Sequence, residues 1–454
     1  MKNFQFSLRT IIWVSAGLLF TSACQKEHAH DHEHYHTDYN PDFRHVRNIL
    51  FPTPTPDRII LNLTEDASTS MAVNWRTDTT VTAGVVEVAV AGHGSDFDDS
   101  ARTIVAATER LDHQHDDEPM VYAHYHSAVM DNLQPNTRYA YRVGQGEVWS
   151  EWIQFTTAGT VEDEVSFIYF GDAQNDVKSM WSRVIREAYT TLPKVDFMLH
   201  AGDLINRHDR DLEWGEWFYA GSFIHSMVPS VMTPGNHEYK DVVLSPQWRP
   251  QFNLPTNGPA GLEEVCYFAD YQDLRVISLD AEQIDESEQY REAQKVWLDS
   301  VLSNNPKKWT AITFHYPVFS TKPNRDNKEL REHFKPIFDK YKVDIVLQGH
   351  DHAYGRGMVN NVPTGFSLND KVSGTMYVVS VSGPKMYDVS EDSWMDRRAK
   401  NTQLFQIISI KGDTLKFEAY TAAGQLYDAF DLVKQPEASN NLINRIPEFK
   451  ERIK

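Results

Sequence analysis

Short runs of alternating hydrophobic and polar residues occupy the chain between Arg58 and Thr157. The runs at 59–63, 71–75 and 85–90 are separated by polar turn residues, and no helical periodicity interrupts them. A turn at 133–137 precedes the run 138–143, whose alternating tyrosines would face one side of a sandwich. The pattern predicts an all-β sandwich over residues 57–158.

The pattern changes after the junction at 158–164, because residues 165–170 form a continuous apolar run typical of a strand covered on both faces. Helical spacing at 177–189 and 290–302 alternates with further buried strands at 196–199, 275–279, 310–314 and 344–347. This alternation predicts an α/β domain over residues 165–434, with layered sheets flanked by helices. Residues 435–454 are expected to form a C-terminal tail.

The N-terminus carries the features of an export signal. Lys2 and Arg9 flank a polar start, and an apolar run at 11–20, too short to span a bilayer, ends in Thr-Ser-Ala-Cys24. Small residues before a cysteine resemble a bacterial lipobox, which predicts a signal peptide over residues 1–24 and lipidation of Cys24. A signal peptide without lipidation is the alternative. Cys266 would then be the remaining cysteine, so no intramolecular disulfide is expected.

Residues 25–56 read as a tether. Histidines alternate with small or acidic residues from His28 to His36, and prolines stiffen the stretch from Pro52 to Pro56. A solvated linker is favoured over weak binding of Zn²⁺ or similar ions. The lipid anchor implies an exported bacterial lipoprotein, periplasmic or at the cell surface, and Gln25 favours the outer membrane because it is not the aspartate that retains many lipoproteins at the inner one.

The charge balance restricts the partners. The chain has 44 basic and 64 acidic residues, a formal net charge of −20, which argues against nucleic acid or an anionic membrane surface as the ligand. An anionic substrate must therefore be attracted locally, and bound cations are one means of doing so.

Metal-type ligands follow five of the predicted strands immediately. Each is common when taken alone, since an aspartate in a turn or a buried histidine is usually structural. Their order and spacing together favour a metal site at the carboxyl ends of the strands. Two cations about 4 Å apart can neutralise a phosphoryl group in transfer, and carboxylate, amide and imidazole ligands suit Fe, Mn or Zn. The five blocks are Gly171-Asp172, Gly202-Asp203, Gly235-Asn236-His237-Glu238, His315 and Gly349-His350-Asp351-His352.

These blocks resemble those of the calcineurin-like metallophosphoesterase superfamily, and residues 58–432 resemble purple acid phosphatases, whose catalytic domain follows a fibronectin type III-like sandwich. The resemblance implies Asp172 and His352 on a first metal ion and Asp203 bridging two ions. It implies a second ion held by Asn236, His315 and His350. Asn236 and His237 would contact the substrate, with His237 and Asp203 as the catalytic residues.

Two departures from the purple acid pattern, and one from other branches of the superfamily, affect these expectations. Asn206 stands where that family has the tyrosine that colours ferric iron, so no purple colour is expected and a divalent pair is favoured over a mixed-valence one. Gln174 stands where other branches of the superfamily have histidine, and it is either an oxygen ligand of the first ion or a supporting residue. The loop after His315 lacks the histidine that protonates the leaving group, so His208 and His333 are weak candidates for that role.

The sequence therefore predicts a dimetal-dependent phosphoric ester hydrolase, acting on a small phosphomonoester by in-line attack of a metal-bound hydroxide. A phosphodiesterase with the same metal core is the first alternative. A surface binding lipoprotein with a relic metal site is the second. The oligomeric state is not predicted.

Overall fold

The computed structural model describes residues 49–115, 118–159, 163–359, 374–435 and 439–453, all within one compact unit. The expected signal peptide, Cys24 and the histidine-rich stretch lie outside the described residues. Among the described helices, none combines the length and the hydropathy needed to cross a bilayer. The described cysteine, Cys266, is buried and has a free thiol.

The N-terminal part is the predicted β-sandwich. Tyr139 and Tyr141 are both buried in it, and the Tyr139 and Phe155 rings stack with centroids 5.8 Å apart. A short 3-10 helix, η1 (Phe97–Ser100), follows the third strand. One sheet contains β1 (Asp57–Asn62), β2 (Met71–Thr77), β6 (Val121–Met130) and β5 (Ala107–His113), and the other contains β4 (Arg102–Val105), β3 (Val85–Val90), β7 (Arg138–Gln145), β8 (Val148–Trp149) and β9 (Ile153–Thr156).

The first of these sheets continues into the second part of the chain. The end of β1 pairs in parallel with β12 (Ser230–Thr233), where Asn62 lies opposite Ser230 and the Leu63 amide donates to the Ser230 carbonyl at 3.1 Å. An eleven-stranded sheet results, in the order β25-β24-β23-β22-β10-β11-β12-β1-β2-β6-β5. Its further strands are β10 (Val165–Phe170), β11 (Phe197–Ala201), β22 (Leu404–Lys411), β23 (Thr414–Thr421), β24 (Leu426–Val433) and β25 (Asn441–Asn444).

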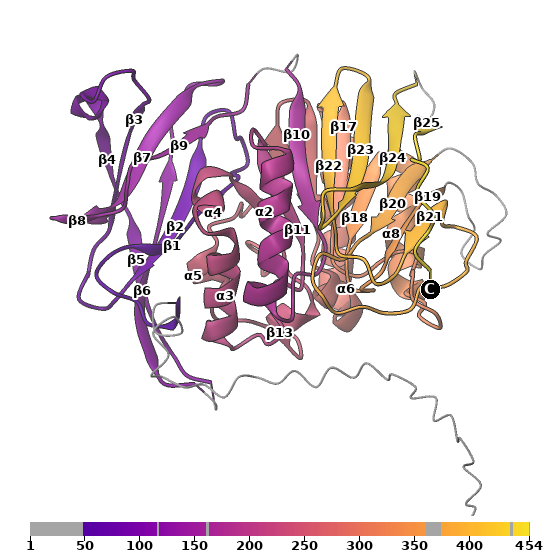
Figure 1. Ribbon diagram of the computed structural model, residues 1–454, viewed down its shortest axis with the longest axis horizontal. Coiled ribbons are helices and arrows are strands. Elements are labelled where there is room, and N and C mark those ends of the chain that lie inside the picture. Colours follow the sequence, from indigo (N-terminus) through magenta and orange to yellow (C-terminus); the bar gives the residue numbers. More distant parts are fainter. Residues whose placement is uncertain (1–48, 116–117, 160–162, 360–373, 436–438, 454) are drawn as a thin grey trace, which may run out of the picture. The chain divides into compact units, whose positions relative to one another are not determined.

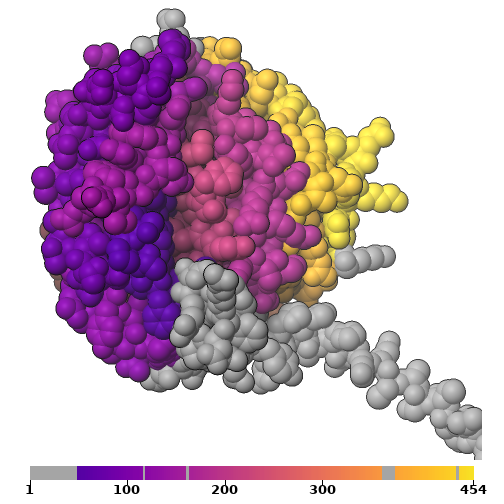
Figure 2. Space-filling view, turned by 60° about the vertical axis from the view of Figure 1, so that its left-hand side comes forward, coloured from indigo at the N-terminus to yellow at the C-terminus, as the bar shows by residue number. Residues whose placement is uncertain are grey.

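A buried ion-pair cluster also joins the sandwich to the second part. Asp211 accepts from Arg58 Nη1 at 2.7 Å and from Arg76 Nη1 at 3.1 Å, and all three side chains are at most 4% exposed. Arg76 also pairs with Asp57 at 2.9 Å. Because removing one partner from such a cluster leaves a buried charge without compensation, these contacts tie the sandwich to the domain that follows. Figure 2 shows the surface of the sandwich, in indigo and purple, adjoining that of the following domain.

A second sheet of seven strands completes the predicted α/β domain. Its order is β15-β16-β17-β18-β20-β19-β21, and β16, β17, β18 and β20 run parallel. The strands are β15 (Tyr267–Tyr271), β16 (Leu274–Ser278), β17 (Trp309–Thr313), β18 (Ile345–Gln348), β20 (Thr375–Val379), β19 (Tyr354–Val359) and β21 (Arg397–Ala399). A small hairpin of β13 (Tyr239–Lys240) and β14 (Val243–Leu244) lies outside both sheets.

Helices cover the sheets (Figure 1). A π-helical turn, η2, leads into α2, and α3 packs beside them, whereas α6, α7 and α8 contact one another. In α7, the side chain of Ser287 caps the first turn and the buried residues recur at helical spacing. The bounds are η2 (Val177–Trp181), α2 (Ser182–Thr191), α3 (Asp211–Gly221), α4 (Phe223–Met227), η3 (Asn236–Glu238), α5 (Trp248–Gln251), α6 (Ala281–Glu286), α7 (Glu288–Ser303) and α8 (Lys328–Tyr341).

Strand β10 explains why its run is apolar throughout. Phe167 stacks on Phe197 of β11 at 4.7 Å, and Phe197 contacts Tyr271 of the second sheet at 5.4 Å. On the opposite face, Phe170 meets Trp181 of η2 at 5.7 Å. Both faces of the strand are therefore buried, one against the second sheet and one against helices.

The stretch expected as a C-terminal tail contributes to the sheet. Strand β25 pairs antiparallel with β24, and Arg452 forms a bridge with Ala399. A strand of four residues with polar ends lacks the alternation that identifies longer strands, since it only adds to an existing edge.

Candidate metal centre

The predicted ligands lie at the carboxyl ends of parallel strands from both sheets. Asp172 follows β10, Asp203 follows β11 and Asn236 follows β12 in the first sheet. His315 follows β17, and the loop 349–352 follows β18 in the second. The two sheets thus bring five loops to one place, as expected for a ligand site in an open α/β sheet.

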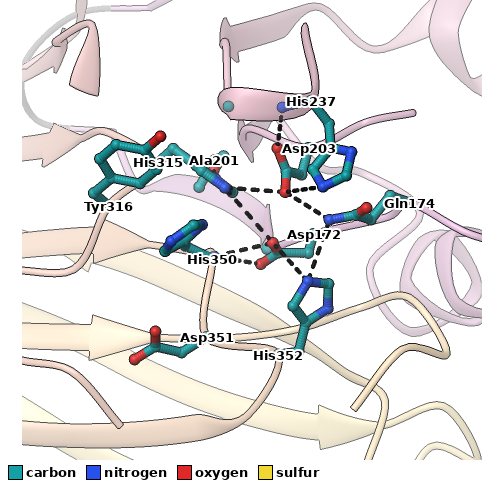
Figure 3. A network of polar contacts seen from close by, with 12 residues as sticks. Asp172, Gln174, Ala201, Asp203, His237, His315, Tyr316, His350, Asp351 and His352 are labelled. Atoms are coloured by element: carbon teal, nitrogen blue, oxygen red, sulfur yellow. Dashed lines mark hydrogen bonds and ion pairs between the residues drawn. The ribbon is translucent and has the colours of Figure 1, made fainter. Parts of the chain in front are cut away.

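Two overlapping groups of acidic and histidine side chains form there, within the described residues. The ligand atoms of each group lie within 4.8 Å of one another, and Asp203 belongs to both. His315 Nε2 is 3.1 Å from Asp203 Oδ2, and His352 Nε2 is 3.8 Å from Asp172 Oδ1 (Figure 3). The groups are Asp203 with His315 and His350, and Asp172 with Asp203 and His352.

The backbone is unusual at these positions. Asp203, His350 and His352 adopt positive φ of 51°, 73° and 46°, a region that non-glycine residues seldom occupy. Gly202 has φ +87°, and a Cβ there would lie 2.7 Å from His315 Nδ1. The glycine before Asp203 is therefore required both by the turn and by the close approach of a ligand.

Two amide side chains of the same loops have buried oxygen atoms. Gln174 is fully buried, and its Nε2 lies 2.6 Å from Asp203 Oδ2 and 3.2 Å from His352 Nε2. Its Oε1, like Asn236 Oδ1, is buried without a hydrogen-bond partner among the described residues. A half turn of the Gln174 amide would present Oε1 at the same position, so both amides can supply oxygen to a cation.

The carboxylates concentrate negative charge at His315. Burial disfavours a charged imidazole, but Asp203 and Asp172 outweigh it and raise the pKa of His315 to about 10. The same proximity lowers the pKa of Asp203 against the effect of burial, whereas burial raises the pKa of Asp172 to about 7. The candidate centre therefore favours positive charge beside Asp172 and Asp203. Its oxygen and nitrogen donors fit two transition-metal ions, Mn²⁺ among them.

His237 lies at the exposed side of the centre. Its Nδ1 lies 2.5 Å from the carbonyl oxygen of Asn206, and its Nε2 lies 3.9 Å from Asp203 Oδ2. The side chain is 26% exposed. Because Nδ1–H donates to the carbonyl, Nε2 is left to face the metal groups and the solvent.

Two residues of the predicted motifs received no role from the sequence, and both fix loops. The buried carboxylate of Glu238 accepts from the backbone amides of Asp203, Leu204 and Gly235 at 2.7 to 2.9 Å. Asp351 Oδ2 accepts from Ser320 Oγ at 2.8 Å, and other groups of the same loop also donate to it. Their place inside the Gly-Asn-His-Glu and Gly-His-Asp-His blocks was the available signal.

The two weak candidates for the leaving-group acid lie in different parts of the chain. His333 lies on α8, where its Nδ1 is 3.2 Å from Lys295 Nζ of α7. His208 Nδ1 lies 3.6 Å from Asp209 Oδ1, in the loop after Asp203. These contacts assign neither histidine to the role, and the leaving-group acid stays unassigned.

Comparison with known proteins agrees with this geometry. Residues 56–157 match the model of the purple acid phosphatase N-terminal domain, and residues 167–354 match that of calcineurin-like phosphoesterases. An uncharacterised protein of Mycobacterium tuberculosis is 26% identical over 71% of this chain and 68% of its own length. A probable inactive purple acid phosphatase of Arabidopsis thaliana is 24% identical over 68% of this chain and 57% of its own length.

Solved structures show the same architecture. A purple acid phosphatase from yellow lupin seeds superposes with a TM-score of 0.69 at 19% identity, covering 84% of this chain and 75% of its own. Among relatives in sequence, acid phosphatase type 7 of Danio rerio is 26% identical over 51% of this chain and 57% of its own length. With two family models matched in order and two candidate metal-ligand groups converging, the chain is a purple acid phosphatase-like protein of the calcineurin-like metallophosphoesterase superfamily.

Proposed function

We propose that this protein is a dimetal-dependent hydrolase of phosphomonoesters. The observation that carries the proposal is the position of Asp203, whose carboxylate belongs to both ligand groups. A carboxylate shared in this way holds two cations at the short separation that phosphoryl transfer requires.

The predicted ligands would bind the two metal ions in two sets that share Asp203. Asp172, Gln174 and His352 would hold one ion, and Asn236, His315 and His350 the other, with Asp203 between them. When bound, the ions supply neutralisation of phosphoryl charge and activation of water. Backbone carbonyls orient two of these histidines: His315 Nδ1 donates to the Ala201 carbonyl at 2.8 Å, and His352 Nδ1 donates to the Lys385 carbonyl at 3.1 Å.

His237 is proposed as the residue that contacts the phosphate. Its donated Nδ1–H fixes the ring, so Nε2 points toward Asp203 Oδ2 from the exposed side. From there it would hydrogen bond to a phosphoryl oxygen whose negative charge grows during transfer. Asn236 would orient the same group with its amide.

The preference for monoesters rests on charge. A monoester carries more negative charge than a diester, and the face beside His352 presents the side chains of Lys322 and Lys385 near one tyrosine. The zebrafish relative is named as an acid phosphatase, which supports the same direction.

The test is hydrolysis by the full chain, stripped of metal and then reloaded with Mn²⁺, Zn²⁺ or Fe²⁺. We expect turnover of p-nitrophenyl phosphate to exceed that of the bis-p-nitrophenyl ester. Asp203→Asn should abolish turnover, whereas Asp131→Asn, which changes an exposed carboxylate of the sandwich, should not. Preference for the diester would assign a phosphodiesterase, and near-normal turnover of Asp203→Asn would refute the bridging role.

We also propose that the protein is an exported lipoprotein, on the basis of the residues that end in Cys24. Labelled palmitate should be incorporated by the wild-type chain and not by Cys24→Ser. Equal labelling of the two chains would contradict the proposal.

A further inference from the structure

Two loops meet beside the first ligand group. The loop after β17 carries Lys322, and the loop after β20 carries Lys385 and Tyr387. Lys322 Nζ lies 4.1 Å from the centroid of the Tyr387 ring, and Lys385 Nζ lies 5.6 Å from the same centroid. Two ammonium groups therefore share one aromatic ring, an arrangement that attracts each cation to the ring but repels the cations from each other.

The position of Lys322 is fixed by a buried carboxylate. Asp351 Oδ2 accepts from the backbone amides of Thr321 and Lys322 at 2.5 and 3.2 Å. Asp351 Oδ1 accepts from Arg325 Nη1 at 2.7 Å. Because Asp351 stands between the ligands His350 and His352, the loop that carries Lys322 is held directly against the metal centre.

The other loop is attached to His352 itself. The Tyr387 amide donates to the His352 carbonyl at 3.1 Å, and the two rings lie 4.7 Å apart in an edge-to-face arrangement. His352 Nδ1 donates to the Lys385 carbonyl at 3.1 Å. The three residues Lys322, Lys385 and Tyr387, which we call the lysine pair site, thus lie one side chain beyond the first ligand group.

Neither ammonium group of this site is held in a close ion pair within the described residues. Among the described residues, no carboxylate lies within ion-pair distance of Lys322 Nζ or Lys385 Nζ. Burial lowers the pKa of Lys322, and the charges of Arg325 and Lys385 act in the same direction, whereas the carboxylate of Asp351 acts against them. Lys322, Lys385 and Arg325 outnumber Asp351, the carboxylate that acts on Lys322 and pairs with Arg325. In a chain with a net charge of −20, this local excess of cations fits an anionic ligand.

We propose that the lysine pair site binds a second anionic group of the substrate, so that the preferred substrates are phosphate esters whose alcohol carries another phosphate or a carboxylate. This inference rests on the proposed function, because it assumes a first phosphate at the dimetal centre. Binding of both groups by one site would raise the effective concentration of the scissile phosphate at the metal ions.

The test compares two non-hydrolysable ligands on the metal-loaded full chain by calorimetric titration. One is an alkyl bisphosphonate with a five-carbon spacer, and the other is the alkyl monophosphonate of equal length. We expect the bisphosphonate to bind roughly tenfold more tightly, as one additional charge-assisted contact allows. Lys322→Gln with Lys385→Gln should remove this preference. Lys322→Arg should retain it, and Lys416→Gln, which changes an exposed lysine of β23, serves as the control.

The outcomes of the binding experiment distinguish failure of the lysine pair site from failure of the proposed hydrolase function. Equal binding of the two ligands by the wild-type chain would overturn it, as would a preference that survives both lysine substitutions. The corresponding bisphosphate ester should likewise show a lower KM than the monophosphate ester, and the substitutions should reduce that ratio. A bisphosphonate preference in a protein that hydrolyses no ester with any metal would leave the site intact and refute the proposed function instead.

Discussion

Two buried histidines, one in the first sheet and one in helix α4, are expected to make the stability of the protein depend on pH. His225 is fully buried and stacks on Trp217 with ring centroids 4.1 Å apart, and His200 of β11 lies nearby. Among the described residues, neither ring has a hydrogen-bond partner for its nitrogen atoms. Burial therefore lowers the pKa of His225 to about 3 and that of His200 well below its ordinary value.

The effect on stability follows from linkage. The unfolded chain binds a proton at His225 near the ordinary pKa of 6.5, whereas the folded chain keeps the ring neutral down to a pH of about 3. The contribution is thus fully present above the unfolded pKa and is lost as the pH falls below it. At about pH 4.5 the loss from His225 is about 2.7 kcal/mol, since each pH unit costs about 1.36 kcal/mol. Total stability of a domain is only about 5–15 kcal/mol.

The measurement is urea unfolding at about pH 7.5 and about pH 4.5 for the wild-type chain and for His225→Gln. The wild type should lose about 2.7 kcal/mol more between the two conditions than the variant does. Each protein is compared with itself, so the packing cost of the substitution cancels. His93→Gln, at an exposed position, should behave as the wild type. Equal losses in wild type and His225→Gln would refute the reasoning.

Three further predictions concern the metal centre and its loops. Gly202→Ala should lose bound metal, measured by elemental analysis, whereas Gly146→Ala, at φ +61° with open space around it, should retain it. Asp351→Asn should lower the free energy of unfolding by about 2 kcal/mol and reduce kcat/KM, since it weakens the hold on the loop, whereas the exposed Asp326→Asn should change little. Gln174→Ala should reduce the bound metal from two ions to one, and an unchanged stoichiometry would show that Gln174 is not a ligand.

Much of the fold and of the candidate site could be predicted because the signals are local. The apolar run of β10 predicted a strand covered on both faces, and the helical spacing of apolar residues predicted α7. Each ligand-bearing loop follows its strand within a few residues, so the order of the blocks was visible before any geometry. Asp172 and Asp203 belong to this class.

Other features depend on contacts between distant segments and carry no local signal. The pairing of Asn62 with Ser230 joins residues 168 positions apart, and β1 reads as an ordinary strand of the sandwich. Lys385 and Tyr387 lie in a loop without a motif, and only the three-dimensional arrangement places them beside Lys322. The role of Asp351 likewise becomes apparent only when its donors are seen.

The parallel pairing of β1 with β12 has a practical consequence for dissecting the protein. If the chain were cut between the sandwich and the phosphoesterase domain, β12 would lose its pairing with β1. The unpaired edge of β12 could then pair with other chains and promote aggregation. The same cut would remove Arg58 and Arg76 from Asp211 and leave its buried carboxylate without a compensating charge. The sandwich therefore covers an edge of the sheet that carries the candidate ligands Asp172 and Asp203. Inactivity of an isolated C-terminal fragment would be expected from misassembly alone and would not test the proposed hydrolysis.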